Sequence, residues 1–144
     1  MSRNARLRFM LVIAIIFGLY SLAWGLAPFD SINLPARFII DISDWPLDKL
    51  STPLDRSTQW LSSIGAGLLA AVSIFLIGIV VPAIKENNQQ VIRTTVIAMC
   101  VWYVIDSAGS VVAGVASNMF FNSVYLLLIL IPLLWKAKVE LSSD

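Results

Sequence analysis

The stretch WLSSIGAGLLAAVSIFLIGIVVPAI, residues 60–84, decides the fold class, because it runs for 25 residues without a charged side chain. A helix rises about 1.5 Å per residue, so roughly 20 apolar residues cross the hydrocarbon core of a bilayer. In lipid every backbone N–H and C=O group needs a partner within its own segment, which favours the α-helix. Residues 60–84 are therefore predicted to form a transmembrane helix.

Three further apolar stretches accompany it along the chain. Residues 9–27 and 119–135 carry no charge, and residues 91–115 hold Asp106 as their only acid. The chain of 144 residues is 58% hydrophobic and 13% charged, whereas a soluble domain carries about 25% charged residues. We predict one all-α domain over 1–144, an integral membrane four-helix bundle with spans near 9–27, 60–84, 91–115 and 119–135 and an outer loop at 28–59.

The first stretch also has features of a signal peptide, since Arg3, Arg6 and Arg8 precede it as a basic region. Its 19 apolar residues exceed the roughly 7–15 that are usual in a signal peptide. We therefore expect residues 9–27 to remain as a true span.

The distribution of Lys and Arg predicts the orientation. With four spans both termini lie on one side, together with the turn between the second and third spans. That side carries Arg3, Arg6, Arg8, Lys85, Arg93, Lys136 and Lys138, and the other carries Arg37, Lys49 and Arg56. Basic residues accumulate on the cytoplasmic side of membrane proteins, so cytoplasmic termini are expected.

The outer loop contains LPARFIIDISDW at 34–45, which has a helical period. Leu34, Phe38, Ile42 and Trp45 fall on one face, and Arg37, Asp41, Asp44 and Asp48 fall on the other. This pattern predicts a short interfacial helix near 35–45, with its apolar face towards the membrane and its acidic face towards water. The helix either plugs the outer end of the bundle or forms a receptor surface or lid.

Small residues predict which spans pack closely, because close backbone approach drives helix association in lipid. The second span has such positions at Ser62, Ala66 and Ala70, beside Ser63, Gly67 and Ala71. The third span and its turn have them at Ser110, Gly114 and Asn118, beside Gly109, Ala113 and Ser117. These faces predict that the second and third spans pack through their outer halves, or that they serve self-association.

Asp106 is the candidate functional residue of the spans. It lies 13 residues past Arg93, which is about 20 Å along a helix and close to the membrane midplane. An ionisable group there costs at least about 2.5–3.5 kcal/mol, so the side chain is expected to face the bundle interior. No Lys or Arg lies at that depth. Asp106 is then either neutral, or held ionised by hydrogen bonds and a solvated cavity.

Polar partners follow from folding the chain back at a turn centred near Ala116. That register places Ser110 level with Asn122, and Asp106 within reach of Tyr125. The predicted intramembrane cluster is Tyr103, Asp106, Ser107, Ser110, Asn122 and Tyr125. Such a cluster either holds the helices together through hydrogen bonds or forms a proton-linked or ligand-binding pocket.

Residue types exclude several kinds of chemistry. The chain has no His, which removes histidine-bound zinc, bis-histidine haem and Ser–His or Cys–His dyads. A single spanning carboxylate cannot form the pair of an aspartyl protease, and no glycine-rich loop suited to phosphate is present. We therefore predict no enzyme, no catalytic or metal-binding residue and no cofactor. A net charge of +1 gives no case for nucleic-acid binding.

WYVIDSAGS at 102–110 and NMFFN at 118–122, together with LPARF and WPLD in the outer loop, resemble small four-span inner-membrane proteins of proteobacteria. The resemblance implies a bacterial origin, an inner-membrane location and a four-helix bundle, and it implies no activity. Small multidrug exporters also have four spans, but their essential acid lies in the first one, which has no acid here.

Two functional hypotheses remain. One is a non-enzymatic accessory, assembly or interaction protein, whose partners are the lipid bilayer and other membrane proteins or further copies of the chain. The other is a small proton-linked carrier or membrane sensor in which Asp106 acts as a protonation switch.

Overall fold

The computed structural model describes residues 1–135, and this range is helical without a strand. The elements are α1 (Arg3–Trp24), α2 (Leu34–Ser43), α3 (Arg56–Phe75), the π-helical turn η1 (Leu76–Val80), α4 (Val81–Glu86), α5 (Gln89–Val112) and α6 (Ala116–Leu134). Four helices are long and apolar enough to cross a membrane, and one of them is continuous from Arg56 to Glu86. The prediction of an all-α, multi-pass membrane protein is confirmed. Lys136 and Lys138, two of the basic residues counted above, lie outside the described residues.

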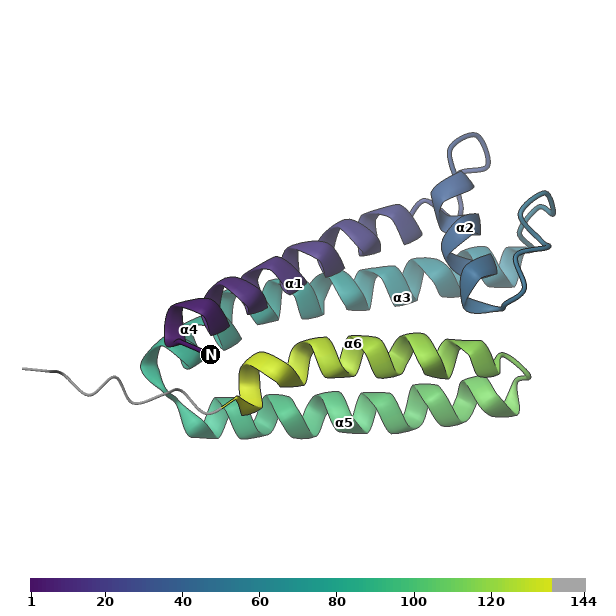
Figure 1. Cartoon of the computed structure of the whole chain (residues 1–144). Helices are drawn as coiled ribbons and strands as arrows, with labels where there is room; N and C mark the ends of the chain where they lie inside the picture. The colour runs from purple at the N-terminus through teal and green to yellow at the C-terminus, as the bar shows by residue number, and fades with distance from the viewer. Residues whose placement is uncertain (136–144) are drawn as a thin grey trace, which may run out of the picture.

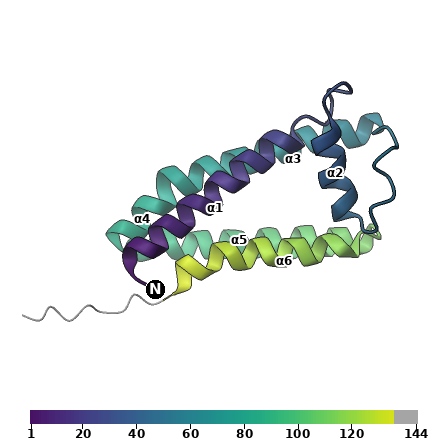
Figure 2. The same ribbon diagram turned by 45° about the horizontal axis from the view of Figure 1, so that its top comes forward.

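The spans form two antiparallel hairpins, α1 with α3–α4 and α5 with α6 (Figure 1). The hairpins meet along α1 and α6 and at the end of the molecule that holds α4, whereas α3 and α5 do not pack on each other. The two hairpins diverge from each other towards the end of the molecule that holds α2 (Figure 2). The core residues are Met10, Ile13, Ala14, Phe17, Leu76, Val80, Ile84, Ile92, Ile129 and Leu133.

The α1–α3 interface contains small residues of α3, and Ala66 of the predicted face is among them, since its Cβ would lie 3.6 Å from a Cβ atom added at Gly25. Gly65 faces Trp24 so closely that a Cβ atom there would lie 2.3 Å from the indole ring. The buried Ser73 hydroxyl donates to the Ala14 carbonyl at 2.7 Å. The predicted contact between the outer halves of the second and third spans is wrong, because the complementary shapes of Trp24 and Gly65 place α3 against α1 instead.

The α3–α4 span contains a π-helical turn directly before Pro82. Proline has no N–H group and its ring clashes with the carbonyl four residues earlier, which disturbs a regular helix. At η1 the Val81 N–H bonds to the Leu76 carbonyl, a five-residue spacing that widens the helix before the proline. The span therefore continues to Glu86 in spite of Pro82.

At the α4 end of the molecule, α1 is joined to the C-terminus of α6 through a buried arginine. Arg6 is 7% exposed. Its Nε donates to the Pro132 carbonyl at 2.7 Å and its guanidinium also donates to the Leu133 carbonyl at 3.2 Å. These carbonyls have no partner within the last turn of a helix, and a cation is favoured there by the helix dipole. The first apolar stretch is thus an integral part of the bundle.

Helix α2 lies across the opposite end of the bundle and reaches from α1 to α6 (Figure 2). The Ser117 hydroxyl donates to the Ser43 carbonyl at 2.6 Å and accepts from the Trp45 N–H at 3.1 Å. The predicted helix near 35–45 therefore exists and occupies the position of a cap, while Phe38 and Trp45 are exposed as expected of groups that face a membrane interface.

The expected position of Asp41 on a water-facing surface is wrong. Its side chain is 2% exposed, because the loop after α2 folds back over it. Both carboxylate oxygens accept from the Lys49 N–H, at 3.1 and 3.2 Å. The carboxylate thus satisfies a loop amide that would otherwise be left without a partner.

Candidate functional site

The site lies between α5 and α6, and the turn between them sets its geometry. Helix α5 ends at Val112 and α6 begins at Ala116, with Gly114 at a φ of 84°. The left-handed region is readily accessible to glycine, which makes it the usual residue just after a helix end. The centre of the turn is therefore Gly114 rather than Ala116, and each residue of α5 faces a position on α6 about one helical turn nearer the α2 end than predicted.

Polar pairs join the two helices at successive levels. The Tyr103 and Ser123 hydroxyls lie 3.0 Å apart. The Asn122 amide donates to the Ser107 hydroxyl at 3.4 Å, and the Asn118 amide donates to the Ser110 hydroxyl at 2.8 Å. We call these pairs, together with Asp106, the polar ladder.

Asp106 joins the ladder at the level closest to the turn. Its Oδ1 accepts from the Ser110 hydroxyl at 3.3 Å and from the Asn118 amide at 3.4 Å. The expectation of a polar partner on the fourth span is met, but Asn118 takes the place expected for Tyr125 or Asn122. Sequence reasoning left Asn118 and Ser123 out of the cluster; placing Gly114 at the centre of the turn would have included both.

Tyr125 is the one member of the predicted cluster that lies outside the ladder. Its ring packs edge-on against Phe17 and Tyr20 of α1, with centroid distances of 5.6 and 6.0 Å. Edge-to-face contacts of this kind add to the burial of apolar surface. Tyr125 therefore joins the two hairpins to each other and does not contact the carboxylate.

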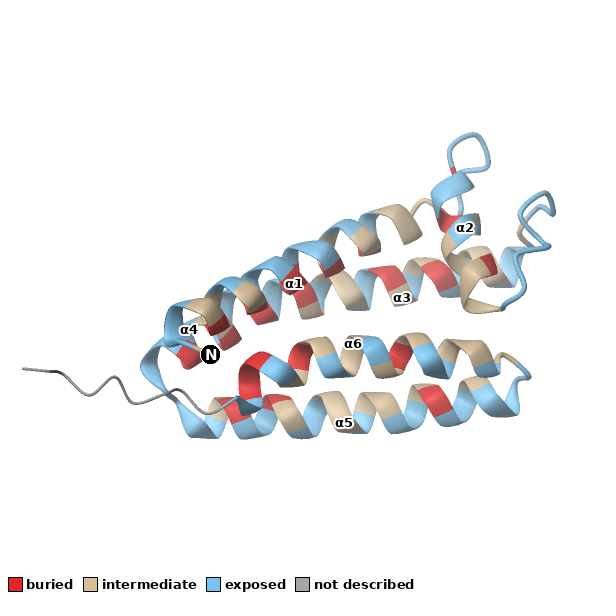
Figure 3. Cartoon of the chain, in the orientation of Figure 1, coloured by how far each residue is buried: buried red, intermediate tan, exposed pale blue. Residues whose placement is uncertain are grey.

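Asp106 lies on the line of α5 residues that packs on the other hairpin near α4. Ile92, Met99, Asp106 and Ala113 recur every seven residues and share one stripe of the helix. Near α4 the stripe is covered, since Ile92 is buried and Met99 packs against the core. Further along, Asp106 is half-buried and Ala113 is exposed. The half of α5 nearest its turn into α6 is mostly intermediate or exposed (Figure 3). Ser110 and Asn118 hold the half-buried carboxylate at the α5–α6 interface, at a level where α3 does not cover α5.

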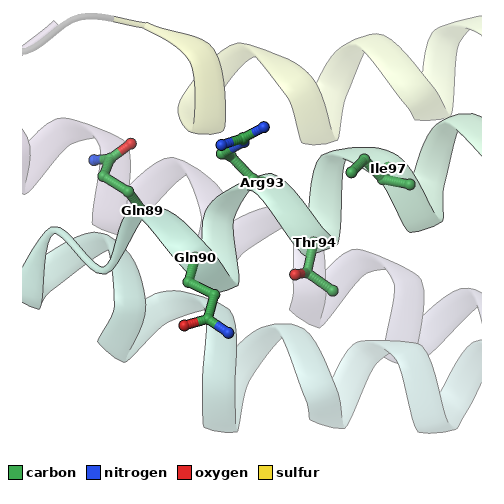
Figure 4. A pocket seen from close by; sticks show the side chains of 5 residues that line it. All are labelled: Gln89, Gln90, Arg93, Thr94 and Ile97. Carbon is green, nitrogen blue, oxygen red and sulfur yellow. The ribbon is translucent and has the colours of Figure 1, made fainter.

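Two hollows lie at opposite ends of the molecule, and neither includes Asp106. One, of about 360 Å³, is lined by side chains of α5 alone, among which Gln90 and Thr94 point away from Gln89, Arg93 and Ile97 (Figure 4). The other, of about 230 Å³, lies under the loop that follows α2. Its acids are engaged within the protein: Asp44 pairs with Lys49, and Asp55 caps α3 by accepting from the Ser57 and Thr58 N–H groups.

The carboxylate of Asp106 can accept hydrogen bonds, and its neighbours are hydroxyl and amide groups. Comparison with known proteins finds no matching family model, no matching curated protein and no matching solved structure.

Proposed function

We propose that this protein is a non-enzymatic interaction protein of the bacterial inner membrane, acting as an accessory or assembly subunit of a larger membrane complex. The observation that supports this most is the exposure of α5. Only 11% of its apolar window is buried within the chain, against 28% for α1 and 22% for each of the other two spans. The span with the only spanning acid is thus the one that its own fold covers least.

The surface of α5 has the character of a helix-packing surface. Gly109 is exposed, and a Cβ atom added there would have no neighbour within 4 Å. Ile105 is 69% exposed and Val112 is 90% exposed. Small residues let a second helix approach closely, and in lipid such packing is a main source of helix association. A partner helix can therefore gain contact along α5 that lipid chains supply less well.

The inner-membrane location rests on the resemblance to proteobacterial four-span proteins, and the orientation rests on the Lys and Arg distribution. The start of α1, the end of α4, the start of α5 and the end of α6 lie at the same end of the molecule (Figure 1). Arg3, Arg8, Lys85 and Arg93 are exposed near that end. We place this end in the cytoplasm.

The alternative is a small proton-linked carrier or sensor that uses Asp106 as a protonation switch. The half-buried carboxylate favours it. The low burial of α5 and the exposed Gly109 on its surface favour a helix-packing role more directly. The interaction role is for this reason the better-supported proposal.

Site-specific photocross-linking in intact cells tests the interaction role. A photoreactive amino acid replaces Ile105 on α5, and in a matched control it replaces Leu19 on α1, which is 63% exposed. We expect a discrete, larger adduct from position 105 and none from position 19, because the proposed partner packs on α5 and not on α1. Equal, diffuse cross-linking at both positions would show that lipid covers both faces and would overturn the proposal.

A further inference from the structure

The Asp106 carboxylate is only partly satisfied within the chain. Both of its hydrogen bonds, from Ser110 and from Asn118, go to Oδ1, at 3.3 and 3.4 Å. Within residues 1–135 no hydrogen bond reaches Oδ2, and no Lys or Arg pairs with the carboxylate. A carboxylate has room for about four acceptor contacts. Asp106 therefore retains an acceptor oxygen and, when ionised, an uncompensated charge.

The surroundings of Asp106 leave that oxygen accessible to a neighbour. Ile105 and Gly109, adjacent to Asp106 on the helix surface, are both exposed, and Ala113 one heptad further on is exposed too. The side chain of a helix that packs on this part of α5 can reach the carboxylate. Hydrocarbon chains offer no donor to it.

Within residues 1–135, a second copy of the chain offers no free cation at the depth of Asp106. Arg6 is bonded to carbonyls of α6. Arg3, Arg8, Lys85 and Arg93 lie near the α4 end, and Arg56 lies at the first residue of α3, whereas Asp106 lies 6 residues inside the end of α5. Arg93 lies 13 residues from Asp106, which is about 20 Å along α5. Pairing two copies through this face in a symmetric way would instead bring two carboxylates together, and like charges at short distance oppose each other.

We infer that Asp106 is the recognition point for a transmembrane helix of a different protein, one that carries a Lys or Arg side chain at the same depth. This inference rests on the proposed function and names the partner's chemistry. Asp106 lies 17 residues from Gln89 and 6 from Val112, so the cation belongs in the third of the membrane nearest α2. Charge complementarity decides the partner, since an ion pair lowers the penalty that each charge carries alone in lipid.

The test uses the full-length protein in bicelles with designed peptides as probes. Each peptide is a transmembrane helix of Leu and Ala with one variable position, a third of the way along its length. That position holds Lys, Leu or Glu. Peptide binding is measured by energy transfer to a dye on the protein. The parent should bind the Lys peptide about tenfold more tightly than the Leu peptide, the gain expected from one charge-assisted contact.

Three variants make the test specific. Asp106→Asn keeps an oxygen acceptor for Ser110 and Asn118 but removes the charge, so the preference for Lys should disappear. Asp106→Lys should prefer the Glu peptide instead. Leu19→Ile, a conservative change at an exposed position of α1 that leaves the α5 surface intact, should bind like the parent.

Equal binding of the Lys and Leu peptides by the parent would overturn the inference, and so would a preference for Lys that survives in Asp106→Asn. These outcomes are separate from failure of the proposed function. A discrete cross-link at position 105 with no preference for Lys would keep the interaction role and discard the ion pair. Absence of the cross-link would discard the interaction role itself.

Discussion

At the scale of single residues, the environment of each atom decides what a polar group does in this membrane protein. Arg6 is buried at the end of α6, where backbone carbonyls accept its N–H groups. Asp41 is buried where a loop amide donates to it. Asp106 is half-buried and accepts hydrogen bonds through Oδ1 alone.

Asp106 also contributes to the stability of the α5–α6 hairpin, and two substitutions measure that contribution. Asp106→Leu removes the acceptor of two long hydrogen bonds while the Asn118–Ser110 bond at 2.8 Å remains. The loss is therefore expected at about 0.6–2 kcal/mol. Asp106→Asn should unfold at the same temperature as the parent, because the amide oxygen still accepts. A thermal melt in detergent checks both; a Leu variant as stable as the parent would contradict the structural role of the ladder.

At the scale of elements, side-chain shape selects the neighbour of each span. Helices in lipid gain little from hiding one leucine against another, so close approach and hydrogen bonds decide the pairing. Trp24 on Gly65 and Ser73 on the Ala14 carbonyl hold α1 to α3. The polar ladder holds α5 to α6. The two hairpins follow from these two different kinds of contact.

The α1–α3 contact can be tested with a pair of glycines on the same helix. A Cβ atom at Gly65 would lie 2.3 Å from the Trp24 ring, whereas one at Gly67 would meet nothing within 4 Å. Gly65→Ala should therefore destabilise the protein by about 1–3 kcal/mol, the usual cost of overpacking. Gly67→Ala should leave the melting temperature unchanged or slightly raised, since Ala favours helix more than Gly does. Equal melting temperatures for the two variants would show that Trp24 does not pack on Gly65.

At the scale of the whole molecule, the bundle is packed tightly at one end and capped at the other. The core and the Arg6 contact close the α4 end. Helix α2 bridges the opposite end through Ser117. Between these two ends α3 and α5 diverge, so the half of α5 near α2 is open to contact with lipid or with a partner protein.

The orientation of this asymmetric bundle is open to direct measurement. In a Cys100→Ala background, a cysteine at Ser51 in the loop after α2 should react with a membrane-impermeant thiol reagent added to intact cells. A cysteine at Glu86, at the end of α4, should react only after the membrane is opened. Both positions are exposed, so accessibility within the protein does not bias the comparison. The reverse labelling pattern would place the termini outside and contradict the interpretation of the Lys and Arg distribution.

The sequence by itself determined the four spans and the short helix near residues 35–45, because length, apolar content and helical period are local properties. It also determined that Asp106 has a polar partner on the next span, since a short turn forces the two helices to be neighbours. Only the tertiary structure decided which partner that is. The register depends on Gly114 as the centre of the turn, and a shift of two residues there moves every pair by a full helical turn.

Tertiary contacts also determine which helix packs on α3 and which residues surround Asp41. Small residues at four-residue spacing mark a face that allows close approach, but they do not say which helix will fill it. The ring of Trp24 decides this by fitting over Gly65. Helical periodicity placed Asp41 on a polar face, and the loop that covers it comes from residues outside that helix. Both outcomes depend on contacts between segments distant in the chain, which no local pattern specifies.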